Sequence, residues 1–355
     1  MNSVCGNFCI GNRCIGPDSP TYIVAELSAN HNQQFDQAVQ LVRAARTAGA
    51  DAVKIQTYTA DTLTIRCNRP EFRIGGGTLW DGKILYDLYQ EAYMPWEWHS
   101  KLQEVALEEG LDFFSTAFDP TAVDFLEDLG VPVHKIASFE IVDIPLIEKI
   151  ASTGKPIIIS TGMATLGEIE EAVSAARQAG ATQIALLKCT SAYPALPEEM
   201  NLRTISHLAK AFDVPVGLSD HTQGMAVPVA AVASGACMVE KHFTISRAIP
   251  GPDSVFSLEP DEFEALVNAI RVAEKAMGRV YYGMSEKEAQ SSLFRRSLYV
   301  VKEMRADGIF TGENVRSIRP WNGLHPRYLN KVIGRRAAVD ISEGTPLSWS
   351  LINTD

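Results

Sequence analysis

Two short apolar segments of the sequence each end in a histidine, and they lie one strand–helix unit apart. Residues 214–222 carry His221, and residues 236–243 carry His242. A buried parallel strand delivers polar side chains to its carboxyl end, where the active sites of such folds are found. Either histidine alone would be interpreted as a structural residue. Because neutral imidazole is the commonest nitrogen ligand of divalent metals, the matched pair predicts a metal site.

Six further apolar segments that end in polar residues precede this pair, at residues 22–26, 51–56, 112–116, 133–138, 156–161 and 184–190. Stretches with apolar residues at helical spacing follow the strands, at residues 35–48, 96–109, 121–129, 144–152, 166–179, 201–211, 225–233 and 260–277. Eight strands that alternate with eight helices predict an α/β fold, the (β/α)₈ TIM barrel. An open doubly wound sheet is the rival fold, but it usually has fewer strands and often a glycine-rich first turn.

The pattern changes after residue 280. We expect a barrel domain at 1–280 with an N-terminal extension at 1–20, a linker at 281–292 and a small β-rich domain at 293–355. Strands are expected at 297–301, with short strands and turns at 332–339 and 341–346. A domain this small has a thin core, so it is expected to pack on another surface, such as a second subunit.

A long insert, residues 59–93, separates the second and third strands and contains three consecutive glycines before Leu79, Trp80 and Asp81. Loops at the carboxyl end of a barrel carry specificity, so Trp80 and Asp81 are predicted to contact a substrate.

The overall composition limits the function further. A net charge of -11 argues against nucleic-acid binding, and no apolar run is long enough to span a membrane. The first 20 residues lack the apolar stretch of a secretory signal, so a cytoplasmic protein is expected. Cys5, Cys9 and Cys14 cluster near the start, but no second cluster completes a four-ligand metal site. We assign them no role.

The polar residues at the strand ends indicate an anionic ligand. They are Glu26, Lys54, Gln56, Ser115, Thr116, Lys135, Ser138, Ser160, Thr161, Lys188, Thr190, Ser219, His221, Glu240, Lys241 and His242. Lysines and hydroxyls suit a phosphate or a carboxylate, and an unpaired lysine at a buried strand end is costly. Metal-assisted carbon–carbon bond formation with a phosphorylated enol fits, and so does Schiff-base aldol chemistry on Lys188. The residue types alone leave both open.

These positions resemble the sialic acid synthase family, which condenses phosphoenolpyruvate with an acetamido sugar to make nonulosonic acids. The matching stretches are residues 25–31, 54–56, 114–116, 135–138, 160–162, 189–194, 217–221, 240–242 and 250–253. The tail resembles the family's antifreeze-like (SAF) domain. Within the family, the pseudaminic acid synthases are most similar at residues 26–31, 54–58, 79–81, 85–86, 88–89, 95–98 and 323–326.

The resemblance implies a role for each matching position. His221 and His242 would bind the metal, manganese or magnesium, and Glu26 would transfer a proton or hold a sugar hydroxyl. The phosphoenolpyruvate-binding residues would be Lys54, Thr116, Lys135, Ser138, Ser160 and Ser219. The sugar-binding residues would be Gln56, Tyr193, Asp253 and Arg319. Arg319 would come from a neighbouring subunit, which implies a domain-swapped homodimer.

The sequence departs from the sialic acid synthases at two places. Lys188 stands where they tend to have histidine, so the resemblance gives a Schiff-base role no support. The insert also differs, and Leu79 and Trp80 could supply an apolar wall for the methyl group of a deoxy sugar. The expected reaction is that of a pseudaminic acid synthase, acting on a diacetamido-trideoxy altrose sugar. The alternatives are N-acetylneuraminate or legionaminate synthesis, a Schiff-base aldolase, and a non-catalytic sugar-binding barrel.

Overall fold

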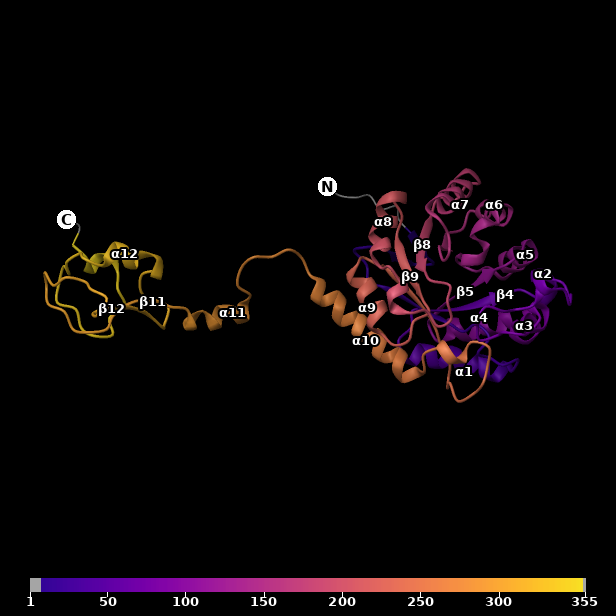
Figure 1. The fold of residues 1–355 in the computed structure, drawn as a ribbon, viewed down its shortest axis with the longest axis horizontal. Coiled ribbons are helices and arrows are strands. Elements are labelled where there is room, and N and C mark those ends of the chain that lie inside the picture. Colours follow the sequence, from indigo (N-terminus) through magenta and orange to yellow (C-terminus); the bar gives the residue numbers. More distant parts are fainter. Residues whose placement is uncertain (1–7, 354–355) are drawn as a thin grey trace. The chain divides into compact units, whose positions relative to one another are not determined.

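The computed structural model describes residues 8–353, and contacts within the chain divide it into two compact units, Met1–Gly278 and Arg279–Asp355. The first unit is built on a closed barrel of eight parallel strands (Figure 1). The strands are β3 (Tyr22–Glu26), β4 (Ala52–Thr57), β5 (Asp112–Ala117), β6 (His134–Ile136), β7 (Ile157–Ser160), β8 (Ile184–Cys189), β9 (Val216–Asp220) and β10 (Met238–His242). Because β10 pairs with β3, the barrel closes, and the predicted TIM barrel is confirmed.

Eight main helices accompany these strands: α1 (Phe35–Thr47), α4 (His99–Glu108), α5 (Pro120–Leu129), α6 (Ile144–Ser152), α7 (Leu166–Gln178), α8 (Arg203–Phe212), α9 (Ala226–Ala233) and α10 (Pro260–Met277). Each buries one apolar stripe against the sheet; in α1 the stripe is Ala38, Leu41, Val42 and Ala45, at helical spacing. Local signals start several helices, such as the capping box of Thr165 and Glu168 at α7.

Strand alternation separates the residues inside the barrel from those in the outer layer. On β10, Met238 belongs to the apolar cluster inside the barrel, whereas Val239 packs in the outer cluster between sheet and helices. Glu240 and His242 therefore face the interior, and Lys241 faces outward. The same period of two places Ser219 inside and Asp220 outside on β9.

A hairpin that the sequence interpretation missed closes the amino end of the barrel. Its strands are β1 (Phe8–Ile10) and β2 (Arg13–Ile15), and Phe8, Ile10 and Ile15 pack into the interior apolar cluster. Cys9 and Cys14 are register partners across this hairpin and form a disulfide. Part of the expected N-terminal extension is thus an ordered plug, while Cys5 lies outside the described residues.

The insert after β4 contains two helices, α2 (Ala60–Leu63) and α3 (Leu85–Ala92), where the sequence predicted only a loop. Between them the chain turns back on itself, because Ile74 N–H donates to the carbonyl of Lys83 and Gly82 N–H donates to that of Ile74. Gly76 and Gly77 have φ angles of +99° and +86°, which a residue with a Cβ rarely adopts.

The second unit is small and β-rich, as predicted. It contains an antiparallel pair, β11 (Ser297–Val300) and β12 (Val315–Ile318), around a core that includes Leu298, Phe310 and Leu347. The short strands expected at 332–339 and 341–346 are reduced to isolated bridges: Val332 ends the short helix α12 (Leu329–Val332), and no strand follows it up to residue 353. No helix within residues 8–353 is long and apolar enough to cross a membrane.

Candidate active site

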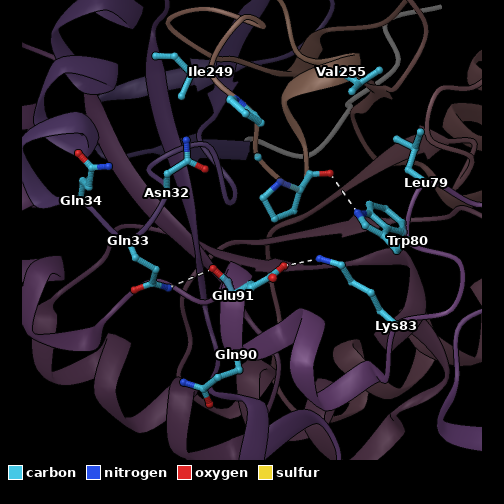
Figure 2. A pocket seen from close by; sticks show the side chains of 13 residues that line it. Asn32, Gln33, Gln34, Leu79, Trp80, Lys83, Gln90, Glu91, Ile249 and Val255 are labelled. Carbon is cyan, nitrogen blue, oxygen red and sulfur yellow. Dashed lines mark hydrogen bonds and ion pairs between the residues drawn. The ribbon is translucent and has the colours of Figure 1, made fainter.

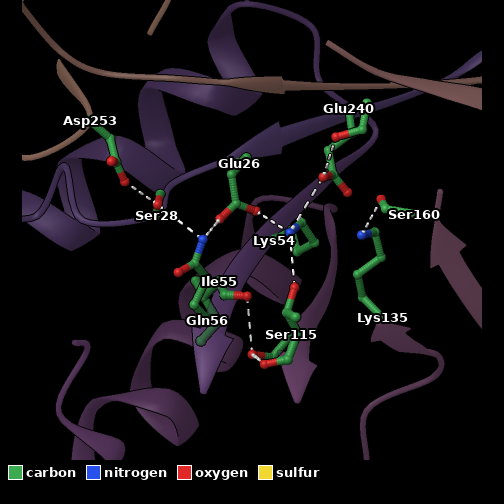
Figure 3. A network of polar contacts seen from close by, with 12 residues as sticks. Glu26, Ser28, Lys54, Ile55, Gln56, Ser115, Lys135, Ser160, Glu240 and Asp253 are labelled. Atoms are coloured by element: carbon green, nitrogen blue, oxygen red, sulfur yellow. Dashed lines mark hydrogen bonds and ion pairs between the residues drawn. The ribbon is translucent and has the colours of Figure 1, made fainter. Parts of the chain in front are cut away.

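A ring of polar side chains lies inside the barrel, two residues further along the strands than an apolar layer. It includes Glu26, Lys54, Thr116, Lys135, Ser160, Cys189, Ser219 and Glu240, above interior residues such as Val24, Ala52, Phe114 and Met238. Lys54 lies at its centre (Figure 3): its Nζ is 2.7 Å from Glu26 Oε2, 3.5 Å from Glu240 Oε1 and 2.9 Å from Thr116 Oγ1. The predicted anion-binding residues are thus brought together.

The buried charges of this ring shift one another's pKa values. Burial raises the pKa of Glu26, and Glu240 adds to the rise against the opposing effect of Lys54. Burial alone would lower the pKa of Lys54, but the two carboxylates outweigh it and raise the pKa, so the lysine stays charged. The second ammonium, that of Lys135, has a lowered pKa because it is buried and faces Lys54, despite the attraction of Glu240. A bound phosphate or carboxylate would stabilise both ammoniums.

Hydroxyl groups complete the anion-binding ring. Lys135 Nζ donates to Ser160 Oγ at 2.7 Å, and Ser219 Oγ donates to Glu240 Oε1 at 3.1 Å. Ser138 Oγ accepts a hydrogen bond from Gly162 N–H at 3.0 Å. A Cβ at Gly162 would lie only 2.7 Å from that hydroxyl, so glycine is needed for the close approach.

His221 and His242 face each other at the barrel mouth, with ring centroids 5.3 Å apart. His221 Nδ1 lies 2.9 Å from the carbonyl of Thr190 and donates to it, so Nε2 is the acceptor of the ring in its neutral form. His242 Nδ1 is buried without a hydrogen-bond partner in the described structure. The pKa of His242 is well below its usual value because the ring is buried near the positive groups of His221 and Lys54. Its neutral form is the one that binds metals.

These two histidines fit a divalent metal as a pair of nitrogen ligands. Among residues 8–353, no group of three or more His, Cys, Asp and Glu side chains is arranged to hold a metal ion. A metal held by this pair would take its other ligands from substrate and water, as open catalytic sites do.

The predicted sugar-binding residues of the barrel line a cavity of about 400 Å³ beside His242. Gln56 Nε2 donates to Glu26 Oε1 and to Ser28 Oγ, both at 3.0 Å, and Ser28 donates to Asp253. Gln56 thus links the lining of the cavity to Glu26 of the polar ring. Its remaining lining is mostly apolar and comes from the insert, with Leu63, Ile74, Leu85 and Leu88.

Trp80 forms the edge of this cavity. Its ring lies 5.8 Å from that of Tyr193, and its Nε1–H donates to the carbonyl of Pro252 at 3.1 Å (Figure 2). The same two residues, Trp80 and Pro252, also line an open outer cleft of about 830 Å³. The tryptophan therefore separates the inner cavity from the outer cleft and ties the insert to the loop after β10.

Four other polar residues are placed elsewhere. Asp81 is exposed, and its carboxylate accepts hydrogen bonds from Gly77 N–H and from the N–H and hydroxyl of Thr78, so it shapes the glycine turn. The sequence pattern places Lys188 and Lys241 among the mouth residues, but strand alternation turns both side chains outward. Arg319 belongs to the second unit, where its guanidinium lies 5.9 Å from the ring centre of Phe294.

Two acidic residues deserve roles that the sequence interpretation did not give them. Glu240 bridges Lys54 and Ser219, and its Oε2 is buried without a hydrogen bond to any residue of 8–353. Glu140, on the 3₁₀ turn after β6, lines the sugar-sized cavity, and burial raises its pKa to about 7 despite the influence of Lys135. The strand alternation of residues 238–242 could have identified Glu240. Nothing in the sequence marks Glu140, which lies beyond its strand.

Known proteins are similar over nearly the whole chain. Residues 41–282 match the NeuB family, and residues 295–353 match the SAF domain. A pseudaminic acid synthase of Campylobacter jejuni is 44% identical, over 96% of this chain and 98% of that protein. An N,N'-diacetyllegionaminic acid synthase of Legionella pneumophila is 37% identical, over 95% and 96%.

The fold of a solved relative agrees with this match. The structure of an N-acetylneuraminic acid synthetase from Leptospira borgpetersenii, in complex with citrate, has a TM-score of 0.72 and 31% identity, and covers 81% of this chain and 95% of its own. The chain therefore belongs to the NeuB family, is an enzyme of the nonulosonic acid synthase class, and ends in a SAF domain.

Proposed function

We propose that the protein is a pseudaminic acid synthase. It condenses phosphoenolpyruvate and water with 2,4-diacetamido-2,4,6-trideoxy-altrose, and it releases pseudaminic acid and phosphate by C–O cleavage. The observation that carries the proposal is the anion-binding ring around Lys54 and Lys135, which Gln56 links to a cavity with an apolar wall. The similarity to relatives named pseudaminic acid synthases supports the choice of sugar.

Phosphoenolpyruvate binds in the ring at the floor of the site. Lys54 and Lys135 offset the charges of its phosphate and carboxylate, and hydroxyls donate to the remaining oxygens. The hydroxyl donors are those of Thr116, Ser138, Ser160 and Ser219. Glu240 holds Lys54 and Ser219 in place before the substrate arrives. This arrangement keeps the methylene carbon of the enol directed toward the sugar cavity.

The open-chain sugar occupies the adjoining cavity with its aldehyde near the two histidines. A manganese or magnesium ion held by His221 and His242 would polarise that aldehyde. The methylene carbon attacks the aldehyde carbon, and Glu26 transfers the proton that the new alkoxide needs. Water adds to the resulting cation at the enol carbon and loses a proton, and phosphate then leaves with its bridging oxygen.

The sugar is recognised by polar groups on one side and apolar groups on the other. Gln56, Tyr193 and Asp253 contact its hydroxyl and acetamido groups. The insert supplies Trp80 and the leucines of the cavity wall. Burial against this wall stabilises a methyl group, whereas it is unfavourable for a hydroxyl group that finds no hydrogen-bond partner there. This contrast favours a 6-deoxy sugar over N-acetylmannosamine, whose sixth carbon carries a hydroxyl.

We also propose that the SAF domain of a second copy covers the mouth, in a domain-swapped homodimer that delivers Arg319 to an acetamido group. Large apolar side chains are exposed on the loops at the carboxyl end of the barrel, including Phe139, Met163, Leu196 and Val255. Residues 293–355 carry ten Lys and Arg against six Asp and Glu, while the rest of the chain is strongly acidic. Opposite charge and unburied apolar area both favour such docking.

Complementation between two inactive variants tests the swap. His242→Ala removes a barrel residue and Arg319→Ala removes a tail residue, so each homodimer should be inactive. After the two are unfolded together and refolded, mixed dimers would contain one intact site each, and about a quarter of the wild-type activity should return. No recovery in verified mixed dimers would mean that each tail serves its own barrel.

Phosphate release from phosphoenolpyruvate tests the reaction itself. The enzyme, with manganese, is offered the diacetamido altrose sugar, its mannose-like counterpart that yields a legionaminic acid, and N-acetylmannosamine, each with and without EDTA. Release with the altrose sugar alone, abolished by EDTA, supports the full proposal. Phosphate release with one of the other two sugars would support the same reaction but would identify the enzyme as a legionaminate or N-acetylneuraminate synthase. Sugar binding without any release would favour a non-catalytic barrel.

A further inference from the structure

A buried ion pair lies directly behind the two histidines, in the layer between the barrel and its helices. Lys241 Nζ is 2.5 Å from Asp220 Oδ2, and both side chains are 0% exposed. The two residues are register partners on β9 and β10, and each immediately precedes one of the histidines in the chain. Their strand neighbours that face the same layer, Leu218 and Val239, are apolar.

The pair is bonded to the turn that carries His221. Thr222 N–H donates to Asp220 Oδ1 at 3.1 Å, and the Thr222 hydroxyl donates to the same oxygen at 2.9 Å. Lys241 Nζ also donates to the carbonyl of Thr222. Both backbone polar groups of Thr222 therefore bind to the pair, so the residues on either side of His221 are tied to the residue before His242.

Strand pairing includes His242 but not His221. His242 pairs with Glu26 in the ladder between β10 and β3, so regular strand pairing fixes its backbone. The ladder between β9 and β10 ends at Asp220, and His221 lies one residue beyond it. Other contacts must therefore fix His221; its Nδ1 contact with Thr190 sets the ring orientation, and the Ala195 N–H bond to its carbonyl adds one backbone tie.

We infer that Asp220, Lys241 and Thr222 are positioning residues that set the distance and angle between the two metal-binding imidazoles. A buried ion pair is a poor source of stability, since an apolar pair of similar volume fills such a layer equally well. The pair instead constrains the position of one turn, because its hydrogen bonds all reach Thr222. The inference rests on the proposed metal role of His221 and His242, and it assigns a function to residues that touch neither substrate nor metal.

The test replaces the pair by side chains of similar volume and measures metal binding rather than turnover. Asp220→Leu combined with Lys241→Met removes both charges, so neither is left buried alone. Free Mn²⁺ is followed by electron paramagnetic resonance during titration of the full-length protein, and the d–d spectrum of the Co²⁺ complex reports the ligand geometry. We expect a folded variant whose Kd for Mn²⁺ is raised at least tenfold and whose Co²⁺ spectrum is altered.

A milder variant and a matched control complete the design. Thr222→Val removes only the hydroxyl bonds and should weaken Mn²⁺ binding severalfold, even if the double variant does not fold. Glu127→Gln with Lys155→Met removes a different ion pair of the barrel, 2.9 Å long, and should leave the Kd unchanged. A fall in thermal stability that leaves both Kd and Co²⁺ spectrum unchanged would show that the network only packs the barrel.

The wild type and His221→Ala separate this inference from the proposed function. If the wild type binds no Mn²⁺, or if His221→Ala binds it normally, the metal role of the histidines is refuted and the positioning inference falls with it. If the histidines are required, but the Asp220–Lys241 and Thr222 variants bind Mn²⁺ like the wild type, the positioning inference alone is overturned.

Discussion

Glu26 ends β3, and its register partner Lys54 lies within the neighbouring strand β4; their side chains form a buried ion pair with Oε2 and Nζ 2.7 Å apart. The pair lies on the boundary between two regions: Lys54 also contacts Thr116 in the anion-binding ring, and Glu26 also accepts from Gln56, which lines the sugar cavity. In the proposed mechanism, an anion bound to Lys54 would compete with Glu26 for the ammonium group and would free the carboxyl group to act on the sugar.

This competition predicts the behaviour of Glu26→Gln, which keeps the shape of the side chain but removes its charge. The kcat should fall about 10²–10³-fold, as expected for loss of a proton-transfer group. The KM for phosphoenolpyruvate should stay the same or fall, since Lys54 then has one competitor fewer. Steady-state kinetics with both substrates measure the two effects. A tenfold rise in that KM with kcat unchanged would instead assign Glu26 to anion binding.

Lys135 and Lys188 give opposite predictions although each is the penultimate residue of its barrel strand. Lys135→Met should weaken phosphoenolpyruvate binding about 10–100-fold, since it removes a charge-assisted contact in the ring. Lys188→Met should remain within about twofold of the wild type, because Lys188 Nζ donates instead to the carbonyl of Cys189, at 2.6 Å. Borohydride with pyruvate should trap no adduct; an adduct on Lys188 would restore the aldolase alternative.

Trp80 should control the choice of sugar. Trp80→Ala opens the inner cavity to the outer cleft, so kcat/KM for the diacetamido-trideoxy sugar should fall about 10–100-fold, the loss expected for a few kcal/mol of apolar contact. N-acetylmannosamine, which gains nothing from the wall, should be affected less. Trp80→Phe is the matched control, because it keeps a ring but loses the bond to Pro252. Unchanged sugar preference in Trp80→Ala would remove the proposed role of the insert.

Glu140 should make stability depend on pH. Its pKa is about 7 in the folded protein, against 4.5 for the ordinary carboxyl, so the folded state holds the proton more tightly. Wild-type stability should therefore fall as pH rises from about 4.5 to 7, by roughly 1–3 kcal/mol. Glu140→Gln should lack this loss and become the more stable protein at pH 8. Urea unfolding of both proteins at pH 5 and pH 8 measures the difference; an equal difference at both values would refute the prediction.

The sequence by itself determined the number and order of the strands and helices and the identity of most polar residues in the mouth. Local patterns suffice for this, because apolar runs, helical spacing and strand-end polar residues depend on neighbours in the chain. Family resemblance then assigned expected roles to those positions. Lys54, Lys135 and the two histidines were singled out in this way, and the structure brings them together.

The tertiary structure alone decided which strand-end residues share a face and what lies beside them. Lys188 and Lys241 lie near strand ends, which predicts a place at the mouth, but the period of two along each strand turns their side chains outward. The carboxylate of Asp81 accepts hydrogen bonds from its own turn. Part of the expected N-terminal extension forms the hairpin of β1 and β2, which closes the barrel. Glu140 lines the cavity from a turn that follows its strand. Such placements depend on barrel closure and on contacts between residues far apart in sequence, which no local pattern encodes.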